Sequence, residues 1–184
     1  MTVSRPPRWH GEVRPRAPTV VVGLTTVDDE LLAAARRFAV PLQARLALVH
    51  IDETAYVADH HPDGSVSAYP IDADLIDTEW TTEQDTFERG LRTRLRDSGL
   101  NWSLWWSAGN PGIELDLVAH DTEATAIIVG ARRGGAWGRL HEWINGSVAA
   151  YVIHHQTRPV IVIPPASTPK DQPRVGSGSP DGAP

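Results

Sequence analysis

Short apolar runs alternate with segments of helical periodicity along most of the chain. The runs are too short for helices and are typical of buried strands, whereas the segments between them repeat their apolar residues at helical spacing. Predicted strands are 19–23, 44–51, 101–106, 126–129 and 160–163, and predicted helices are 28–39, 77–98 and two that follow turns at 109–112 and 145–147. This alternation predicts βαβ crossovers and a parallel sheet covered by helices on both faces.

The polar residues at the element ends support this assignment. Asp28 and Ser147 are placed to accept hydrogen bonds from the free amides that begin their helices. In strand 101–106, Trp102 and Trp106 are expected on one face and Trp105 on the other. In the third helix the inward residues are expected to be Ile113, Leu117 and Val118.

Length and composition suggest one domain of ordinary size. The chain has 184 residues, and we expect a domain at 18–165 between a flexible leader at 1–17 and a disordered tail at 166–184. It has no cysteine, no apolar stretch near the ~20 residues of a membrane span, and no apolar core after its basic N-terminus. We therefore expect a cytoplasmic protein that does not enter a membrane.

The uneven charge is more informative than its sum. Residues 52–79 hold eight acids and no lysine or arginine, a charge of -8. Because the net charge of the whole chain is -6, the remaining residues sum to +2. No basic patch is present, so nucleic-acid binding is not expected. This acidic connection is long for a compact α/β domain, which leaves it as either a functional loop or a disordered one, with a turn at 60–64.

The segment 126–164 carries the candidate chemistry. It reads as strand, glycine-rich loop, helix start and strand, and Gly130, Gly134, Gly135 and Gly138 lie in the loop. Small residues before a helix N-terminus admit a phosphate to backbone amides. Ligands of parallel sheets bind beyond the carboxyl ends of strands, so residues 23–26, 49–51 and 130 onward are the places to inspect. His50 either lines this rim or is a hydrogen-bonded core residue.

Several short motifs in order resemble the universal stress protein family, single-domain type. They are 20–23 before the first helix, 48–51 ending the second strand, 109–111 opening the third helix, 126–130, 146–148 and 158–163. The resemblance spans roughly 18–165. It implies a five-stranded parallel Rossmann-like (adenine nucleotide α-hydrolase-like) sheet and commonly a homodimer through the last strand, here Val160, Ile161, Val162 and Ile163.

The resemblance also implies a nucleotide site. The ATP-binding branch holds ATP with an Asp after the first strand's glycine, the end of the second strand, and a G-x2-G-x9-G-S/T loop. The corresponding residues are Gly23, Thr25, Val49, Gly130, Arg133, Gly146 and Ser147. Magnesium would accompany ATP.

Two departures leave ATP binding open. Thr25 stands where the pattern has Asp, and Arg133 stands where it has a glycine, with about three residues inserted between Gly130 and Gly146. Arg133 and its neighbours either clamp a triphosphate or obstruct it, and the balance favours obstruction. Gly146 and Ser147 either cap a helix only or also bind phosphate.

Three functions remain in order of preference. The first is a stress-response regulatory dimer that binds ATP at a degenerate glycine loop. The second is an interaction module of the same fold for an unknown protein partner, with the acidic 52–79 connection or the Trp137–Trp143 region as its contact surface. The third is a weak ATP hydrolase. No P-loop, nucleophile elbow, catalytic set or metal-ligand set is nominated, so we do not expect an enzyme.

Overall fold

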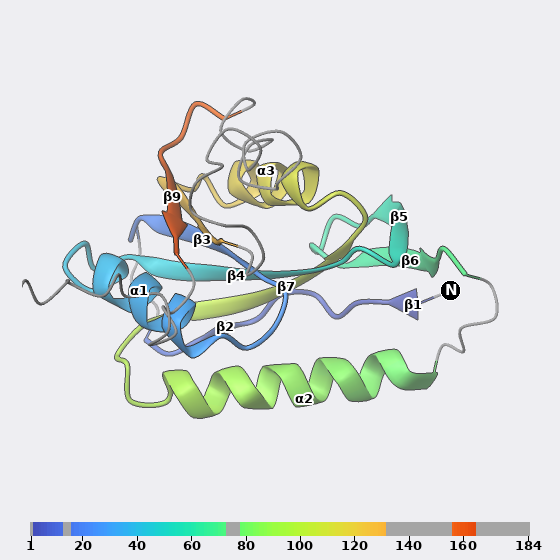
Figure 1. The fold of residues 1–184 in the computed structure, drawn as a ribbon, viewed down its shortest axis with the longest axis horizontal. Coiled ribbons are helices and arrows are strands. Elements are labelled where there is room, and N and C mark those ends of the chain that lie inside the picture. The colour runs from blue at the N-terminus through green and yellow to red at the C-terminus, as the bar shows by residue number, and fades with distance from the viewer. Residues whose placement is uncertain (1, 13–15, 73–77, 132–155, 165–184) are drawn as a thin grey trace, which may run out of the picture.

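The computed structural model describes residues 2–12, 16–72, 78–131 and 156–164 (Figure 1). Two sheets and three helices form in this part of the chain. The elements are β1 Thr2–Val3, β2 Trp9–His10, β3 Thr19–Leu24, α1 Asp29–Ala39, β4 Arg45–Asp52, β5 Ala55–His60, β6 Val66–Pro70, α2 Thr78–Leu95, β7 Trp102–Ala108, α3 Pro111–Asp121, β8 Ala126–Gly130 and β9 Val160–Ile163.

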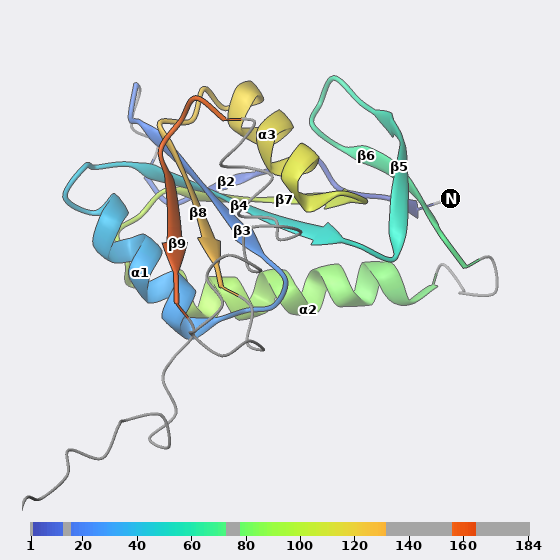
Figure 2. The same ribbon diagram turned by 45° about the horizontal axis from the view of Figure 1, so that its top comes forward.

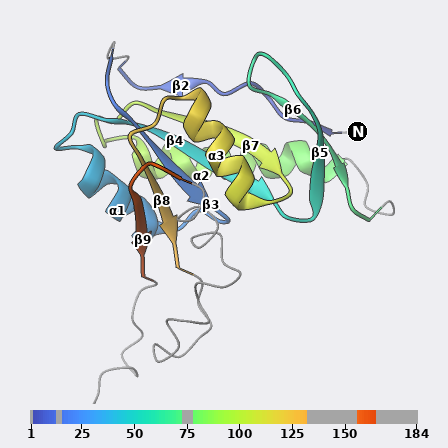
Figure 3. The ribbon, with the colours of Figure 1, turned by 90° about the horizontal axis from the view of Figure 1, so that it is seen from above.

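The main sheet confirms the predicted α/β class. Its order is β2-β7-β4-β3-β8-β9, and the five strands from β7 to β9 are parallel. Helices α1 and α2 cover one face and α3 covers the other (Figures 1 and 3). The sheet has one strand more than predicted, because β2 pairs antiparallel to the outer edge of β7.

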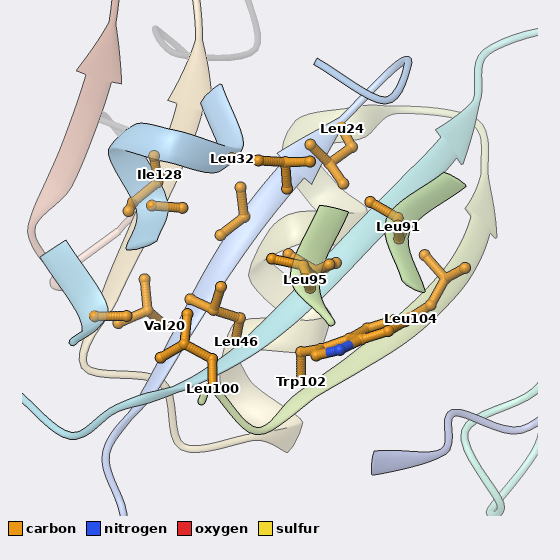
Figure 4. Packing of buried hydrophobic residues seen from close by; sticks show 14 of the residues in the cluster. Val20, Leu24, Leu32, Leu46, Leu91, Leu95, Leu100, Trp102, Leu104 and Ile128 are labelled. Atoms are coloured by element: carbon orange, nitrogen blue, oxygen red, sulfur yellow. The ribbon is translucent and has the colours of Figure 1, made fainter. Parts of the chain in front are cut away.

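Two apolar clusters hold the layers together, one on each face of the sheet. On the first face, Leu46 of β4 and Ile128 of β8 pack with α1 and with Leu91 and Leu95 of α2 (Figure 4). On the other face, Leu115 of α3 packs on the alternate residues of β3, β4 and β8. Because the central strands are buried on both faces, their sequences are continuously apolar, as the strand prediction assumed.

The local predictions hold for the Asp28 cap and the tryptophan faces but not for the inward residues of α3, and the Ser147 cap with its helix lies outside the described residues. Asp28 caps α1 as expected, and Asn110 caps α3 with bonds to the amides of Gly112 and Ile113. Trp102 and Trp106 lie on the α2 face and Trp105 on the α3 face, as predicted. The α3 assignment was partly wrong: Ile113 and Leu117 are exposed, and the buried residues are Gly112, Glu114, Leu115, Val118 and Ala119.

The first residues do not behave as the flexible leader expected for 1–17. Ser4 is buried, its amide donates to Val66 O at 3.0 Å, and its Oγ accepts from Val66 N at 3.0 Å. Trp9 pairs with Ser103 and lies under the Arg45 guanidinium, 4.5 Å from the ring centre. These contacts join residues far apart in sequence, and periodicity within 1–17 could not reveal them.

The acidic connection is a β-hairpin over most of its length, so its described part is neither an irregular loop nor disordered, and its functional role stays a prediction. β5 and β6 pair antiparallel, β1 joins β6, and the resulting three-stranded sheet stands beside the far end of β4 (Figures 1 and 2). The predicted turn at 60–64 connects the strands, where His61 N donates to Ser65 O at 2.9 Å. Residues 73–77, the Trp137–Trp143 region and the tail lie outside the described residues.

Candidate functional site

The carboxyl ends of β3 and β8 lie next to each other at the point where the strand order reverses (Figure 2). The chain runs from β3 outward to β4 and β7 and then returns through α3 to β8 on the other side of β3. Gly23 pairs with Val129, so the segments that follow both strands leave the sheet together. This is the position where open parallel sheets bind ligands, and the strand ends around Gly23, Thr25 and Gly130 are called the switch-point crevice.

Gly23 and Gly130 flank this crevice for different reasons. A methyl group on Gly23 would lie 3.1 Å from Leu115 Cδ1, so this glycine allows α3 to pack closely on the sheet. A methyl group on Gly130 would meet Leu31 Cδ2 at 3.4 Å, an ordinary contact, and Gly130 is exposed. Packing therefore explains Gly23 but not Gly130.

Thr25 is exposed directly after β3, where a hydroxyl can reach a ligand. The nearby start of α1 is less available. The Asp28 carboxylate accepts hydrogen bonds from Glu30 N at 2.9 Å and Leu31 N at 3.1 Å. Because this side chain already satisfies free amides and places a negative charge there, the α1 N-terminus is unsuited to a phosphate.

Val49 and His50, expected at the end of the second strand, lie within β4, which continues to Asp52, and they offer no side chain to the crevice. Val49 has no exposed surface and packs against the α3 layer, so only its backbone is close to the strand end. His50 is on the opposite face between Phe87 and Trp106, with ring centres 4.6 and 4.4 Å away.

Burial determines the chemistry of His50. It lowers the pKa of His50, against a weaker opposing effect of a hydrogen bond with the Leu24 backbone. Nδ1 is buried and has no hydrogen-bond partner among the described residues. Of the two roles left open for His50, the core position is the observed one, although its hydrogen bonding is incomplete.

Arg133, Gly146 and Ser147 lie outside the described residues. Their part in a phosphate loop therefore remains a prediction from the motif. The crevice residues that the structure brings together are Gly23, Thr25 and Gly130, from segments about a hundred positions apart, as the topology rule predicted.

A buried carboxyl group that the sequence analysis missed lies under the hairpin. Glu114 of α3 accepts a hydrogen bond from the Ser107 hydroxyl, and His60 Nε2 of β5 is 3.9 Å from the same carboxylate oxygen. Burial raises the pKa of Glu114, and the Ser107 bond and the His60 charge oppose this more weakly. Helical spacing could have found Glu114, because it lies one turn before the buried Val118.

This cluster connects the hairpin to α3 but is not arranged for nucleophilic catalysis. The Ser107 hydroxyl donates to the glutamate, and the histidine contacts the glutamate instead of the serine. The neighbouring His61 has its own partner, with 2.7 Å between Nε2 and Ser67 Oγ. Among the described residues, no group of three or more metal-binding side chains occurs.

A doubly wound α/β domain, with the switch point of its strand order between β3 and β8, is the class that these observations define. A model of the universal stress protein family matches residues 18–164, and the chain belongs to that family. No curated protein matched the sequence.

The fold is also similar to solved universal stress proteins. UspA from Lactobacillus plantarum is 24% identical with a TM-score of 0.56, covering 82% of this chain and 99% of its own. The universal stress protein from Archaeoglobus fulgidus in complex with dAMP is 18% identical with a TM-score of 0.54, and the match covers 79% of this chain and 97% of that protein. A universal stress protein in complex with cAMP is 19% identical with a TM-score of 0.54, and the match covers 80% of this chain and 96% of that protein. At these identities the likeness establishes the fold.

In the described part of the chain, no helix is long and apolar enough to cross a membrane.

Proposed function

We propose that this universal stress protein binds an adenine nucleotide beyond β3 and β8 and acts in the cytoplasm as a regulatory homodimer in stress responses. The observation that carries the nucleotide proposal is the switch point, where exposed Thr25 and Gly130 lie at the ends of adjacent strands. Solved relatives of this fold include complexes with dAMP and cAMP, which supports an adenine nucleotide. ATP with magnesium is the form that the glycine-loop motif favours.

In this proposal Thr25 contacts the ribose, and Gly130, Gly146 and Ser147 contact the phosphates. A neutral hydroxyl is a weaker acceptor than a carboxylate by about 1 kcal/mol, so Thr25 lowers affinity roughly fivefold relative to an aspartate. Arg133 then decides which nucleotides fit. Occupancy changes the surface around the glycine loop, and a protein partner reads that change.

Calorimetric titration with ATP and magnesium, dAMP and cAMP tests the nucleotide site. We expect a dissociation constant under ~100 µM for at least one nucleotide, weakened by Ser147→Ala and by Gly146→Val. Thr25→Asp should tighten binding roughly fivefold. Thr86→Asp adds the same charge at an exposed position of α2 and should change nothing. Absence of heat with all three nucleotides at high protein concentration contradicts the proposal.

The edge strand β9 supports the dimer. It is the last strand of the sheet and pairs only with β8 among the described residues. Ile127 N donates to Pro159 O, and Ala131 N donates to Ile163 O. The backbone groups of 159, 161 and 163 therefore point to β8, and those of Val160 and Val162 point to the free edge, where a second copy can pair.

Val162→Pro tests this dimer with little harm to the sheet. Proline removes the outward N–H of residue 162 and leaves the bonds to β8 in place. Sedimentation at micromolar concentration should show a dimer for the wild type and a monomer for the variant. The variant should still unfold cooperatively on heating, which would show that its sheet is intact. A wild-type monomer contradicts the pairing.

The second candidate is an interaction module that binds no nucleotide. It is favoured by the exposed apolar side chains on the added hairpin, Tyr56, Tyr69 and Ile71. A weak ATP hydrolase is the third candidate, and release of phosphate that Ser147→Ala abolishes would support it. If no nucleotide produces heat in the titrations and the protein is still a dimer, the interaction module is favoured over the nucleotide-binding protein.

A further inference from the structure

Gly90 lies in the interior of α2, where glycine is unfavourable. Glycine weakens a helix interior relative to alanine, because it has more backbone freedom to lose on folding. A methyl group on Gly90 would lie 3.3 Å from Val27 Cγ2, so Val27 would have to move by a few tenths of an ångström. Gly90 therefore allows α2 to pack closely on the segment that follows β3.

The same segment makes a second contact with α2, one turn further along the helix. The Arg94 guanidinium donates to the carboxylate of Asp29, the first residue of α1. Residues four apart lie on one face of a helix, so the turn 90–94 of α2 faces residues 27–29. Because the Arg94–Asp29 pair is exposed, it adds little free energy, and the packing of Val27 on Gly90 is the stronger constraint.

Thr25 lies between this contact and the fixed end of β3. Leu24 is 2% exposed and belongs to the same buried cluster as Leu91 of α2 (Figure 4). Val27 is partly buried and packs against that cluster as well. The two exposed residues Thr25 and Thr26 are therefore held on both sides, and the placement of Val27 determines where the Thr25 hydroxyl lies.

We propose that the packing of Val27 on Gly90 positions Thr25 for the ribose of an adenine nucleotide. This inference rests on the proposed function and makes Gly90 and Val27 positioning residues that act through Thr25. An outward movement of Val27 carries the Thr25 hydroxyl with it, because only Thr26 separates the two residues. A contact group that is displaced from its productive position binds less well although its chemistry is unchanged.

Helix propensity alone leads to the opposite expectation for Gly90. If this glycine mattered only within α2, a better helix former in its place would stabilise the protein and leave ligand affinity unchanged. The positioning role instead predicts a loss of affinity without a comparable loss of stability. Affinity and stability measured on the same variants therefore separate the two explanations.

Methyl NMR of the nucleotide-free full chain reads the surroundings of Thr25. Gly90→Ala and Gly90→Leu should shift the Thr25 methyl signal, and leucine should shift it more, because the larger side chain displaces Val27 further. Thr86→Ala is the matched control, since Thr86 is an exposed residue of the same helix, and it should leave the signal in place. Val27→Ala makes room for the leucine, so its combination with Gly90→Leu should return the signal toward the wild-type position.

Calorimetric titration with ATP and magnesium, dAMP and cAMP then measures the effect on affinity. Thr25→Val removes the hydroxyl and should weaken binding about fivefold. Gly90→Leu should weaken binding by up to the same factor, and it should add nothing to Thr25→Val, because the hydroxyl that it displaces is already absent. The combination of Gly90→Leu with Val27→Ala should recover most of the wild-type affinity.

Three results would overturn the proposal. The first is an unmoved Thr25 signal in Gly90→Leu, and the second is a shifted signal with unchanged nucleotide affinity. The third is that the losses from Gly90→Leu and Thr25→Val multiply when combined, which would indicate a general weakening of the fold. Thermal unfolding verifies that each variant is folded, and Gly90→Ala is the milder substitution if leucine is not tolerated.

Failure of the proposed function would look different. In that case the wild type gives no heat with any of the three nucleotides. The Thr25 signal is read without nucleotide, so a shift in Gly90→Leu would still support the positioning of Thr25 by α2, and an unmoved signal would still refute it.

Discussion

The parallel sheet and the added three-stranded sheet are stabilised in very different ways. The central strands of the parallel sheet are buried on both faces by large aliphatic side chains such as Leu46 and Ile128. The added sheet buries smaller apolar side chains, Ala55, Ala68 and Val66, and exposes Tyr56 and Tyr69. Apolar area is therefore concentrated in one sheet, while the other relies more on backbone pairing and on Ser4.

This difference determines where substitutions change stability. A fully buried leucine or isoleucine contributes about 1.5–3 kcal/mol of transfer free energy, and an exposed tyrosine contributes far less. Substitutions of Tyr56 and Tyr69 should therefore leave the protein folded, whereas those of buried residues in the parallel sheet should destabilise it. The crevice lies at the end of the stable sheet, so its position is fixed by the core.

The largest expected effect comes from the core. Leu46→Ala removes a side chain with no exposed surface and leaves a cavity between β4 and the two helices of that face, which should lower the unfolding free energy by about 2–5 kcal/mol. Urea denaturation measures it. Tyr56→Ser is the hairpin counterpart and should stay within about 0.5 kcal/mol. Equal losses would refute the contrast between the sheets.

The two crevice glycines should respond differently to the same change. Gly23→Ala brings a methyl group to 3.1 Å from Leu115 and should destabilise by about 1–3 kcal/mol. Gly130→Ala meets only an ordinary contact and should change stability by less than about 0.5 kcal/mol. Denaturation of both variants checks this, and a large loss at Gly130 would give that glycine a packing role.

The α1 cap should have a moderate effect. Asp28→Ala removes the acceptor for the amides of Glu30 and Leu31 and should lower the unfolding free energy by about 1 kcal/mol. Asp28→Asn keeps an acceptor oxygen, so its unfolding free energy should fall by only about a few tenths of a kcal/mol. If both variants lose equally, the carboxylate charge matters more than the hydrogen bonds.

The smallest effects should appear in the pH dependence, with opposite signs in the two regions. The pKa of core His50 is lowered by burial, so its contribution is present above the unfolded value of 6.5 and is lost as the pH falls toward the folded pKa. The pKa of Glu114 is raised by burial, so its contribution is present below 4.5 and is lost as the pH rises through the folded pKa.

Neutral variants isolate these slopes. The stability difference between wild type and His50→Gln should move against the wild type on acidification below about pH 6.5. The difference for Glu114→Gln should move against the wild type as the pH rises above about 4.5. Urea denaturation across pH 4–8 measures both. Parallel slopes would show that local burial does not control these groups.

Much of the fold could be predicted because its signals are local. The apolar run 126–129, the Asp28 cap and the alternation of Trp102, Trp105 and Trp106 each depend on a few neighbouring residues. The topology rule then placed Gly23 beside the end of β8, because parallel strands end at one edge. The loop residues Arg133, Gly146 and Ser147 remain predictions of the motif.

The sequence by itself thus determined the α/β class, because periodicity and capping act over one or two turns. The ordered motifs indicated the family, and the topology rule located the crevice at the strand ends. Only the tertiary structure decided that the first residues join two sheets, that the acidic connection folds as a hairpin, and that Glu114 is buried beside Ser107 and His60. The contact between Ser4 and Val66 spans 62 positions. No local pattern records such a pairing, because its free energy comes from surfaces that meet only after the chain has folded.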